Sequence, residues 1–350
     1  MKTKYNKNVC IADYISCVNC NNEPIGHAKK ILIENCQWLK NKYNITCAAS
    51  KEYIKDLKEI KSKKLPFRVV EGKNYNYFCG KIIKLFISWI NIIYCFSCKG
   101  YVWFDNVDIL LIIYLFFHPI KCKRTIISLY TNSFEKKYHN YMFLCVTKRV
   151  KLFISSSKVN IVPNSFYLPD YLYKDDIYIK YKSNIKVNDF ICLGVMSEDK
   201  ELEKLIQIFR GRKEKLLIIG HFINREWFLK LQQIAGNNVE VVDTYLEYDM
   251  YLGLLSKSRF CILPYKKEVY ENKTSGVAIE SIFLNTVPVS LKTLIRNWDI
   301  EGIGYDEIEN LWKQDMSEER INVIKNSNSR VITEKYNADV YLKKIINELE

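Results

Sequence analysis

Short apolar runs alternate with segments of helical periodicity along the chain, and this alternation limits the fold more than any other feature. In the first half, strand-like apolar runs lie at 9–15, 44–50, 65–70, 101–105, 125–131 and 152–157. The segments between them, such as 27–43, are long enough for crossover helices. Because strands that alternate with helices form parallel sheets, the pattern predicts an α/β domain.

The same alternation restarts in the second half of the chain. Strands are predicted at 189–195, 216–221, 239–243, 259–265 and 287–290, with helices at 199–209, 224–235, 247–257 and 275–284. Prolines and aspartates in 161–176 mark a boundary, with the hinge at 165–187. We therefore expect a first domain at 1–170, a second at 171–334, and a C-terminal segment at 335–350 whose helix returns to the first domain.

Two segments, 82–96 and 109–118, are the most apolar in the chain. Each is shorter than the roughly 20 residues that span a bilayer, so both are predicted to be helices packed on the sheet. Lys81, Lys84 and Lys99 flank the first of them. A membrane-surface role for this segment is the alternative, and both roles can hold on opposite faces of one helix.

Charge is distributed unevenly between the two halves. Residues 1–170 contain 27 Lys and Arg against 11 Asp and Glu, whereas residues 171–350 contain 26 against 28. A basic first half favours an anionic partner, which can be nucleic acid, anionic lipid headgroups or a phosphorylated substrate. Because no compact basic and aromatic motif occurs, we predict no nucleic-acid partner. The first residues lack a continuous apolar stretch, so we predict a cytoplasmic protein.

The stretch ILPYKKEVYENKTSGVAIESIFLNTVPVS (262–290) carries the most chemical information. It has the pattern of a strand, a loop, a helix and a second strand. A helix that begins near Ser275 leaves the first-turn N–H groups of Ser275, Gly276 and Val277 available to phosphate oxygens. Gly276 lets a ligand approach the backbone because it has no Cβ. Glu280 lies one turn further on the same face.

This stretch resembles the donor-binding segment of GT-B glycosyltransferases, especially those similar to glycosyltransferase family 4. The resemblance implies two Rossmann-like domains with parallel sheets facing across a cleft, and a nucleotide-sugar donor bound by the second domain. It also implies that Glu280 holds the ribose hydroxyls. The family usually has another glutamate seven residues earlier, where this chain has Asn272, and either Glu271 or Glu268 nearby can take its place. Asn285 stands in place of a glycine.

Two further donor-side residues follow from the resemblance. Family 4 enzymes have a basic pair after the first strand of the second domain, and here Lys200 alone is available to contact the diphosphate. Gly220, which ends the predicted strand at 216–221, is expected to line the nucleotide pocket.

The acceptor side is predicted in the first domain. Gly26 and His27 begin the first helix and resemble the Gly-His entry of several GT-B families, in which the histidine is the base. An imidazole with a pKa of about 6.5 can accept a proton at neutral pH, so His27 is our first choice. Asp13 and Asp105, at the ends of strands, are the alternatives. Asn132 lies where family 4 enzymes often have a histidine, which leaves inverting and retaining chemistry open.

The sequence thus predicts a hexosyltransferase-like glycosyltransferase of surface polysaccharide or lipopolysaccharide biosynthesis. Its acceptor is expected to be a saccharide or a lipid-linked saccharide, with the protein peripheral on the inner face of the membrane. We predict no cofactor and no metal, because the pairs Cys17/Cys20 and Cys95/Cys98 lack the tight-turn glycines of a zinc site. The alternatives are a non-catalytic GT-B-like protein that binds carbohydrate or nucleotide, and a basic nucleic-acid-binding protein.

Overall fold

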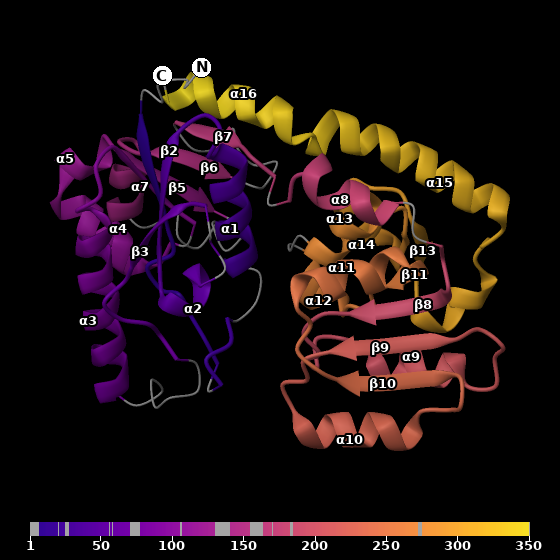
Figure 1. Cartoon of the computed structure of the whole chain (residues 1–350). Helices are drawn as coiled ribbons and strands as arrows, with labels where there is room; N and C mark the ends of the chain where they lie inside the picture. The colour runs from indigo at the N-terminus through magenta and orange to yellow at the C-terminus, as the bar shows by residue number, and fades with distance from the viewer. Residues whose placement is uncertain are drawn as a thin grey trace. The chain divides into compact units, whose positions relative to one another are not determined.

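A computed structural model describes residues 7–349, except 20, 25–27, 56, 58, 71–77, 106, 130–140, 155–163, 170, 183–184 and 272–274. The chain forms two compact units, Met1–Asp170 and Tyr171–Glu350 (Figure 1). Each unit contains one parallel sheet covered by helices. The predicted α/β class with two parallel sheets is confirmed.

The first unit has a seven-stranded sheet of order β3-β2-β1-β4-β5-β6-β7. Its elements in chain order are β1 (Asn8–Ala12), α1 (Ala28–Leu39), β2 (Asn44–Ala49), α2 (Lys51–Ile54), β3 (Lys61–Lys64), α3 (Phe78–Cys95), β4 (Tyr101–Phe104), α4 (Ile109–Phe117), α5 (Pro119–Cys122), β5 (Thr125–Leu129), α7 (Tyr141–Thr147), β6 (Lys151–Ile154) and β7 (Ser165–Tyr167). All neighbouring strands are parallel. Helices α3, α4 and α7 share one core with the sheet, and α1 lies on its other side (Figure 1).

The strand predicted at 65–70 is wrong. The strand in this part of the chain is β3, Lys61–Lys64, which pairs with β2 at the edge of the sheet. The apolar residues Leu65, Val69 and Val70 are buried outside the named strands, and Val70 forms an isolated bridge with Val18. Their apolar pattern therefore reflects burial in the core. Lysines are common on edge strands because they discourage pairing with other chains. A strand rich in lysine does not form an apolar run, so the apolar pattern of the sequence does not predict it.

The second unit has a six-stranded parallel sheet of order β10-β9-β8-β11-β12-β13. Its elements are α8 (Asp175–Lys182), β8 (Asn188–Leu193), α9 (Leu202–Phe209), β9 (Leu216–Gly220), α10 (Arg225–Ile234), β10 (Val239–Asp243), α11 (Tyr248–Ser256), β11 (Ser258–Ile262), α12 (Lys267–Tyr270), α13 (Gly276–Phe283), β12 (Val287–Leu291), α14 (Lys292–Asn297), β13 (Ile303–Tyr305), η2 (Ile308–Lys313), α15 (Glu318–Val331), η3 (Ile332–Tyr336) and α16 (Ala338–Leu349). Two cores cover the two faces of the sheet: α9, α10 and α15 pack on one face, and α8, α11 and α13 on the other.

Some short elements escape the sequence pattern. The segment predicted as a hinge, 165–187, contains β7 and α8, and the short strand β13 was not predicted. The C-terminal helix forms within the predicted range as α16, while its return to the first domain stays a prediction. In the part of the chain that the structure describes, no helix is both long enough and apolar enough to cross a membrane.

Candidate functional site

Each sheet has one position at which the strand order reverses, and ligands of open α/β sheets bind at the carboxyl ends of the strands there. In the second unit this switch point lies between β8 and β11. The loops that follow the two strands are joined: Glu201 N–H donates to the Pro264 carbonyl at 2.7 Å, and Lys266 N–H donates to the Asp199 carbonyl at 3.0 Å. These two hydrogen bonds hold the loops after β8 and β11 in place relative to each other.

Helix α13 begins at this same end of the sheet. Ser275 is its N-cap, and the Ser275 Oγ accepts a hydrogen bond from Ala278 N–H at 3.2 Å. The same Oγ lies 3.1 Å from the hydroxyl of Tyr265, which follows β11. The helix start predicted from the sequence is confirmed, and its first turn presents the positive end of the helix dipole.

Lys200 is buried at the switch point. Its Nζ donates to the Leu193 carbonyl at 3.2 Å and lies 3.5 Å from Met196 Sδ. It lies 5.7 Å from the centre of the Tyr265 ring. Burial lowers the pKa of Lys200, because a charged ammonium is poorly solvated inside a protein. The lysine predicted as a diphosphate ligand is thus buried near the N-terminus of α13.

Two glycines let backbone segments approach each other here. A Cβ on Gly220, the last residue of β9, would lie 1.8 Å from the carbonyl oxygen of Gly194, the residue after β8. A Cβ on Gly194 would lie 3.8 Å from Val277 and 3.9 Å from Lys200 Nζ. The structure therefore brings Gly194, Lys200 and Val277 together, and Gly220 lies directly against Gly194.

The structure shows a packing reason for the glycine at position 276, while its predicted role toward a ligand stays a prediction. A Cβ at this position would lie 2.1 Å from the hydroxyl oxygen of Tyr171, a buried residue of the same unit. Internal packing of Tyr171 against the helix start therefore requires a glycine, whether or not a ligand is bound. This contact was not predicted, because nothing near residue 171 in the sequence points to residue 276.

Glu280 is fully buried, with 0% of its surface exposed. Its Oε1 accepts from Tyr248 at 3.0 Å and from Tyr178 at 3.3 Å, and its Oε2 accepts from Tyr251 at 2.9 Å. Burial, with the Glu280 charge next, raises the pKa of Tyr251 well above its usual value. Both carboxylate oxygens thus have partners within the chain, and the ribose role of Glu280 stays a prediction.

Glu271 is the exposed C-cap of α12. Its backbone carbonyl accepts from Asn297 Nδ2 at 2.8 Å. The residues between Glu271 and Ser275 lie outside the described part of the chain, so the loop through which Glu271 was predicted to reach the sugar is not described.

In the first unit the switch point lies between β1 and β4, and the structure brings Asp13 and Asp105 together there. These residues follow the paired strand ends Ala12 and Phe104, and Asp105 N–H donates to the Ala12 carbonyl at 3.1 Å. Both carboxylates are buried. A carboxylate at the end of either strand can act as a general base.

The two aspartates have different local contacts. Asp13 Oδ1 accepts from the N–H groups of Ile15 at 3.1 Å and Ser16 at 3.0 Å, which holds the loop after β1 in a turn. Asp105 Oδ1 accepts from Asn35 Nδ2 at 3.2 Å, from helix α1. Gly26, His27 and Asn132, the other residues predicted on the acceptor side, lie outside the described residues.

The cysteine pairs form no metal centre that can be described. Among the described residues, no three histidine, cysteine or acidic side chains are grouped so that they could hold a metal ion. The pKa of Cys98 is lowered to about 6, first by a hydrogen bond with the Cys10 thiol and then by the nearby Lys63. Burial raises the pKa of Cys95 well above its usual value. The prediction of no metal and no cofactor stays a prediction.

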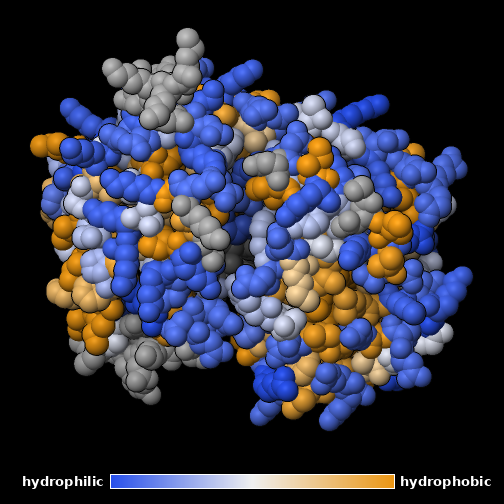
Figure 2. All heavy atoms as spheres, in the orientation of Figure 1, coloured by the Kyte–Doolittle hydropathy of each residue, from blue (hydrophilic) through white to orange (hydrophobic). Residues whose placement is uncertain are grey.

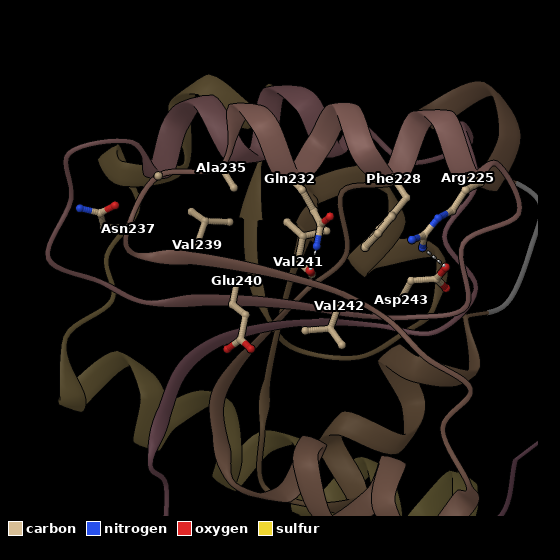
Figure 3. Close-up of a pocket in the computed structure, with 11 residues that line it drawn as sticks. Arg225, Phe228, Gln232, Ala235, Asn237, Val239, Glu240, Val241, Val242 and Asp243 are labelled. Atoms are coloured by element: carbon tan, nitrogen blue, oxygen red, sulfur yellow. Dashed lines mark hydrogen bonds and ion pairs between the residues drawn. The ribbon is translucent and has the colours of Figure 1, made fainter.

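A pocket of about 680 Å³ lies elsewhere, between α10 and the edge strand β10 (Figure 3). Phe228 and Gln232 point from the helix toward the strand, where Gln232 Nε2 donates to the Val241 carbonyl at 3.1 Å. Arg225 and Asp243 form an ion pair of 3.2 Å at one end. Because β10 is the edge strand and the switch point lies between β8 and β11, this pocket is separate from the Lys200 site.

No protein-family model matches the sequence, and a sequence comparison with curated proteins gives no match. Comparison with solved structures does give matches over the whole chain. AviGT4, a glycosyltransferase involved in avilamycin A biosynthesis, matches with a TM-score of 0.58 and 13% identity, covering 98% of each chain. Anabaena HepE in complex with UDP and glucose matches with a TM-score of 0.64 and 11% identity, covering 98% of this chain and 99% of HepE.

A UDP-forming α,α-trehalose-phosphate synthase from Burkholderia xenovorans, in complex with glucose-6-phosphate, matches with a TM-score of 0.69 and 9% identity. The match covers 99% of this chain and 100% of the synthase. At such identities the likeness establishes the fold. The chain therefore has the GT-B fold of these glycosyltransferases, with two Rossmann-like units built on parallel sheets.

Proposed function

We propose that the protein is a glycosyltransferase that moves a sugar from a nucleotide-sugar donor to a saccharide or lipid-linked saccharide acceptor. One observation carries the proposal: the buried Lys200 amino group lies at the switch point of the second unit, where the first turn of α13 also begins. A lysine with free donor capacity beside a helix N-terminus favours a doubly charged group such as a diphosphate. The solved structures of the same fold include complexes with UDP and glucose.

The transfer itself needs few protein groups. The acceptor oxygen bonds to the anomeric carbon of the donor, the bond from that carbon to the diphosphate oxygen breaks, and the nucleoside diphosphate leaves. Lys200 and the α13 dipole stabilise the charge on the leaving group. In an inverting enzyme, a base takes the proton of the acceptor hydroxyl, and Asp13, Asp105 and His27 are the residues proposed for it. The donor contacts of Ser275, Gly276, Val277, Gly220, Glu271 and Glu280 are also proposals.

Calorimetry with UDP, GDP and CDP tests donor binding. We expect one nucleoside diphosphate to bind selectively and the matching nucleoside, which lacks phosphate, to bind at least a hundredfold more weakly, because about 3 kcal/mol comes from charge-assisted contacts. Equal affinity for nucleoside and diphosphate would contradict the proposal. A panel of sugar nucleotides, assayed for release of the diphosphate, then identifies the donor.

Two isosteric variants test the base. Asp13→Asn keeps an oxygen that can accept from Ile15 and Ser16, and Asp105→Asn keeps one that can accept from Asn35. Each variant should fold and bind nucleotide, and the one that removes the base should lose transfer by about 10²- to 10⁴-fold. Full transfer by both variants excludes the two carboxylates and leaves His27, or retaining chemistry without a protein base.

A protein of this fold that binds carbohydrate or nucleotide without transfer is the second candidate. It is favoured by the contacts of Glu280, whose carboxylate is engaged by three tyrosines. Selective nucleotide binding with no turnover of any sugar nucleotide would support this candidate.

We also propose that transfer serves surface polysaccharide or lipopolysaccharide biosynthesis at an anionic membrane surface. The support is the charge of the first unit: residues 72–169 contain 13 Lys and Arg and three Asp and Glu. Anionic headgroups attract such a segment.

A further inference from the structure

Helix α3 of the first unit has its apolar face outside and polar residues inside. Among the side chains of this helix that the structure describes, the exposed ones are apolar apart from Lys84; they are Ile82, Ile83, Leu85, Phe86, Ile93 and Tyr94. We call these six residues the α3 face. Phe86 is 65% exposed, whereas the polar residues Ser88 and Asn91 are 0% exposed. An ordinary surface helix shows the reverse pattern, with its apolar stripe on the core.

Hydrogen bonds hold the helix in this orientation. Asn91 Nδ2 donates to the Tyr14 carbonyl at 2.8 Å and to the Phe67 carbonyl at 3.0 Å. Asn91 Oδ1 accepts from Phe67 N–H at 3.3 Å. Ile92 and Cys95, also on the inner side, pack in the core of the unit. Rotation of α3 to bury the α3 face would break all three bonds, so the fold keeps this face on the outside.

The α3 face is part of a wider apolar surface. Helix α4 packs against α3 and α7 in the same layer. Further exposed apolar residues of this layer are Ile109, Phe117, Ile120, Tyr141 and Leu144. Figure 2 shows apolar side chains gathered where α3 lies in Figure 1, among hydrophilic ones. An exposed apolar surface of this kind marks a contact with a partner or a membrane.

Lysines surround the α3 face. Lys84 is exposed within it, and Lys99 is exposed just beyond the end of the helix. Lys63 Nζ, from the edge strand β3, lies 4.2 Å from the centre of the Tyr94 ring and donates to Ser97 Oγ. No acidic residue occurs between residues 72 and 104 of the sequence. Apolar side chains bordered by lysines match the interface of an anionic bilayer, where acyl chains lie below negative headgroups.

We propose that the α3 face is the surface with which the protein lies on an anionic lipid membrane, with α3 parallel to the membrane plane. The six apolar side chains enter the region between headgroups and acyl chains, and Lys63, Lys84 and Lys99 contact the headgroups. This inference deepens the membrane partner of the proposed function by naming its surface, and it needs no transfer activity. A second copy of the chain is disfavoured because two such faces would bring like-charged lysines together.

Vesicle sedimentation tests the proposal, with vesicles of phosphatidylcholine alone and of phosphatidylcholine with phosphatidylglycerol. The full chain should bind the anionic vesicles, and added salt should weaken this binding. The double variant Ile82→Gln with Phe86→Gln should bind at least about tenfold more weakly, because each change removes exposed apolar area from the interface. The matched control, Ile179→Gln with Val323→Gln, changes two exposed apolar residues on helices of the second unit and should bind like the wild type.

Charge and depth are tested separately. Lys84→Gln with Lys99→Gln should weaken binding to anionic vesicles by about fivefold per lysine and leave binding to neutral vesicles unchanged. Trp89, on the partly buried side of α3, reports on insertion. Brominated lipids should quench the fluorescence of the wild type more than that of Trp89→Phe.

The inference is overturned if the wild type binds neither kind of vesicle, or if the Ile82/Phe86 variant binds like the wild type. It is also overturned if the wild type is a dimer without lipid and that variant is a monomer, since the face would then join two copies. Nucleotide affinity of the Ile82/Phe86 variant, measured without vesicles, should equal that of the wild type. Failure of nucleotide binding would count against the proposed function and leave the vesicle result standing.

Discussion

Two lysines at opposite ends of strand β8, the half-buried Lys186 and the buried Lys200, show how differently the two ends of one sheet are used. Lys186 precedes the strand, and its Nζ donates to the carbonyls of Ser256 at 2.7 Å and Leu284 at 3.1 Å, and to Thr286 Oγ1 at 3.0 Å. Lys200 follows the strand, and Leu193 provides its one oxygen acceptor among the described residues. An ammonium has three donors, so the fold uses all those of Lys186 and leaves capacity at Lys200.

Helix α13 explains this difference. In a parallel α/β sheet, helices run antiparallel to the strands, so their C-termini lie at the amino ends of the strands and their N-termini at the carboxyl ends. Lys186 therefore meets the C-cap of α13, Leu284, where a cation satisfies free carbonyls. Lys200 lies at the other end, near the α13 N-terminus, where a cation and the helix dipole have the same sign. Loss of the proton, which burial favours, or an anion bound from outside relieves that arrangement. The remaining donor capacity at this end is why we propose Lys200 for the donor site.

The sharpest test of the comparison is nucleotide affinity in the two lysine-to-methionine variants. Lys200→Met should weaken binding of the nucleoside diphosphate by about a hundredfold, because it removes a charge-assisted contact worth up to about 3 kcal/mol. Lys186→Met, in the same unit, should leave the affinity of the folded protein unchanged. Calorimetry on both variants measures this, and equal loss in the two would remove the distinction between the ends.

The next largest effect is the pH dependence of stability due to Lys186. Burial lowers the pKa of Lys186 from 10.5 to about 7. Above pH 7 the native lysine loses its proton while the unfolded lysine keeps it, so the unfolded state binds more protons and stability rises with pH. The free energy of unfolding should rise by about 2 kcal/mol more in the wild type than in Lys186→Met between about pH 7 and 9. Denaturant titrations measure this, and parallel profiles would contradict the assigned pKa.

An effect of similar or smaller size is expected at the start of α13. Gly276→Ala should destabilise the protein by about 1–3 kcal/mol, because the new Cβ meets Tyr171. The cost should shrink in the background of Tyr171→Ala, where the ring is absent. Gly253→Ala in α11 is the matched control, since a Cβ there meets nothing within 4 Å. Its effect should be neutral or stabilising by up to about 1 kcal/mol. Additive costs of the Gly276 and Tyr171 changes would show that the contact does not matter.

The smallest effect is expected at Glu280. Tyr251→Phe removes the hydroxyl that donates to Glu280 Oε2, and should cost about 1–2 kcal/mol of stability. If Glu280 serves packing alone, nucleotide affinity stays at the wild-type level. A change in affinity of tenfold or more in Tyr251→Phe would instead link Glu280 to the ribose. Thermal unfolding and calorimetry on the same sample measure both quantities.

Part of the site could be predicted because local chemistry determines it. Ser275 is a strong N-cap residue followed by apolar residues, which places a helix start there whatever surrounds it. Asp13 and Asp105 lie at the ends of strand-like runs, and parallel strands end at a common edge of the sheet. Once the strand order is known, the two residues are expected to be neighbours. The tyrosines around Glu280 could not be predicted, because their positions, 178, 248 and 251, say nothing about which carboxylate they meet.

The sequence by itself determined the class of the fold and the places where elements start, because apolar periodicity and capping act over a few residues. It also determined the basic character of the first unit, which is a matter of counting. Only the tertiary structure decided that β3 lies at 61–64, that Tyr171 requires Gly276, and that α3 presents its apolar face outward. Each of these depends on contacts between residues far apart in the chain, and periodicity shows that a helix has two faces but not which of them the sheet will cover.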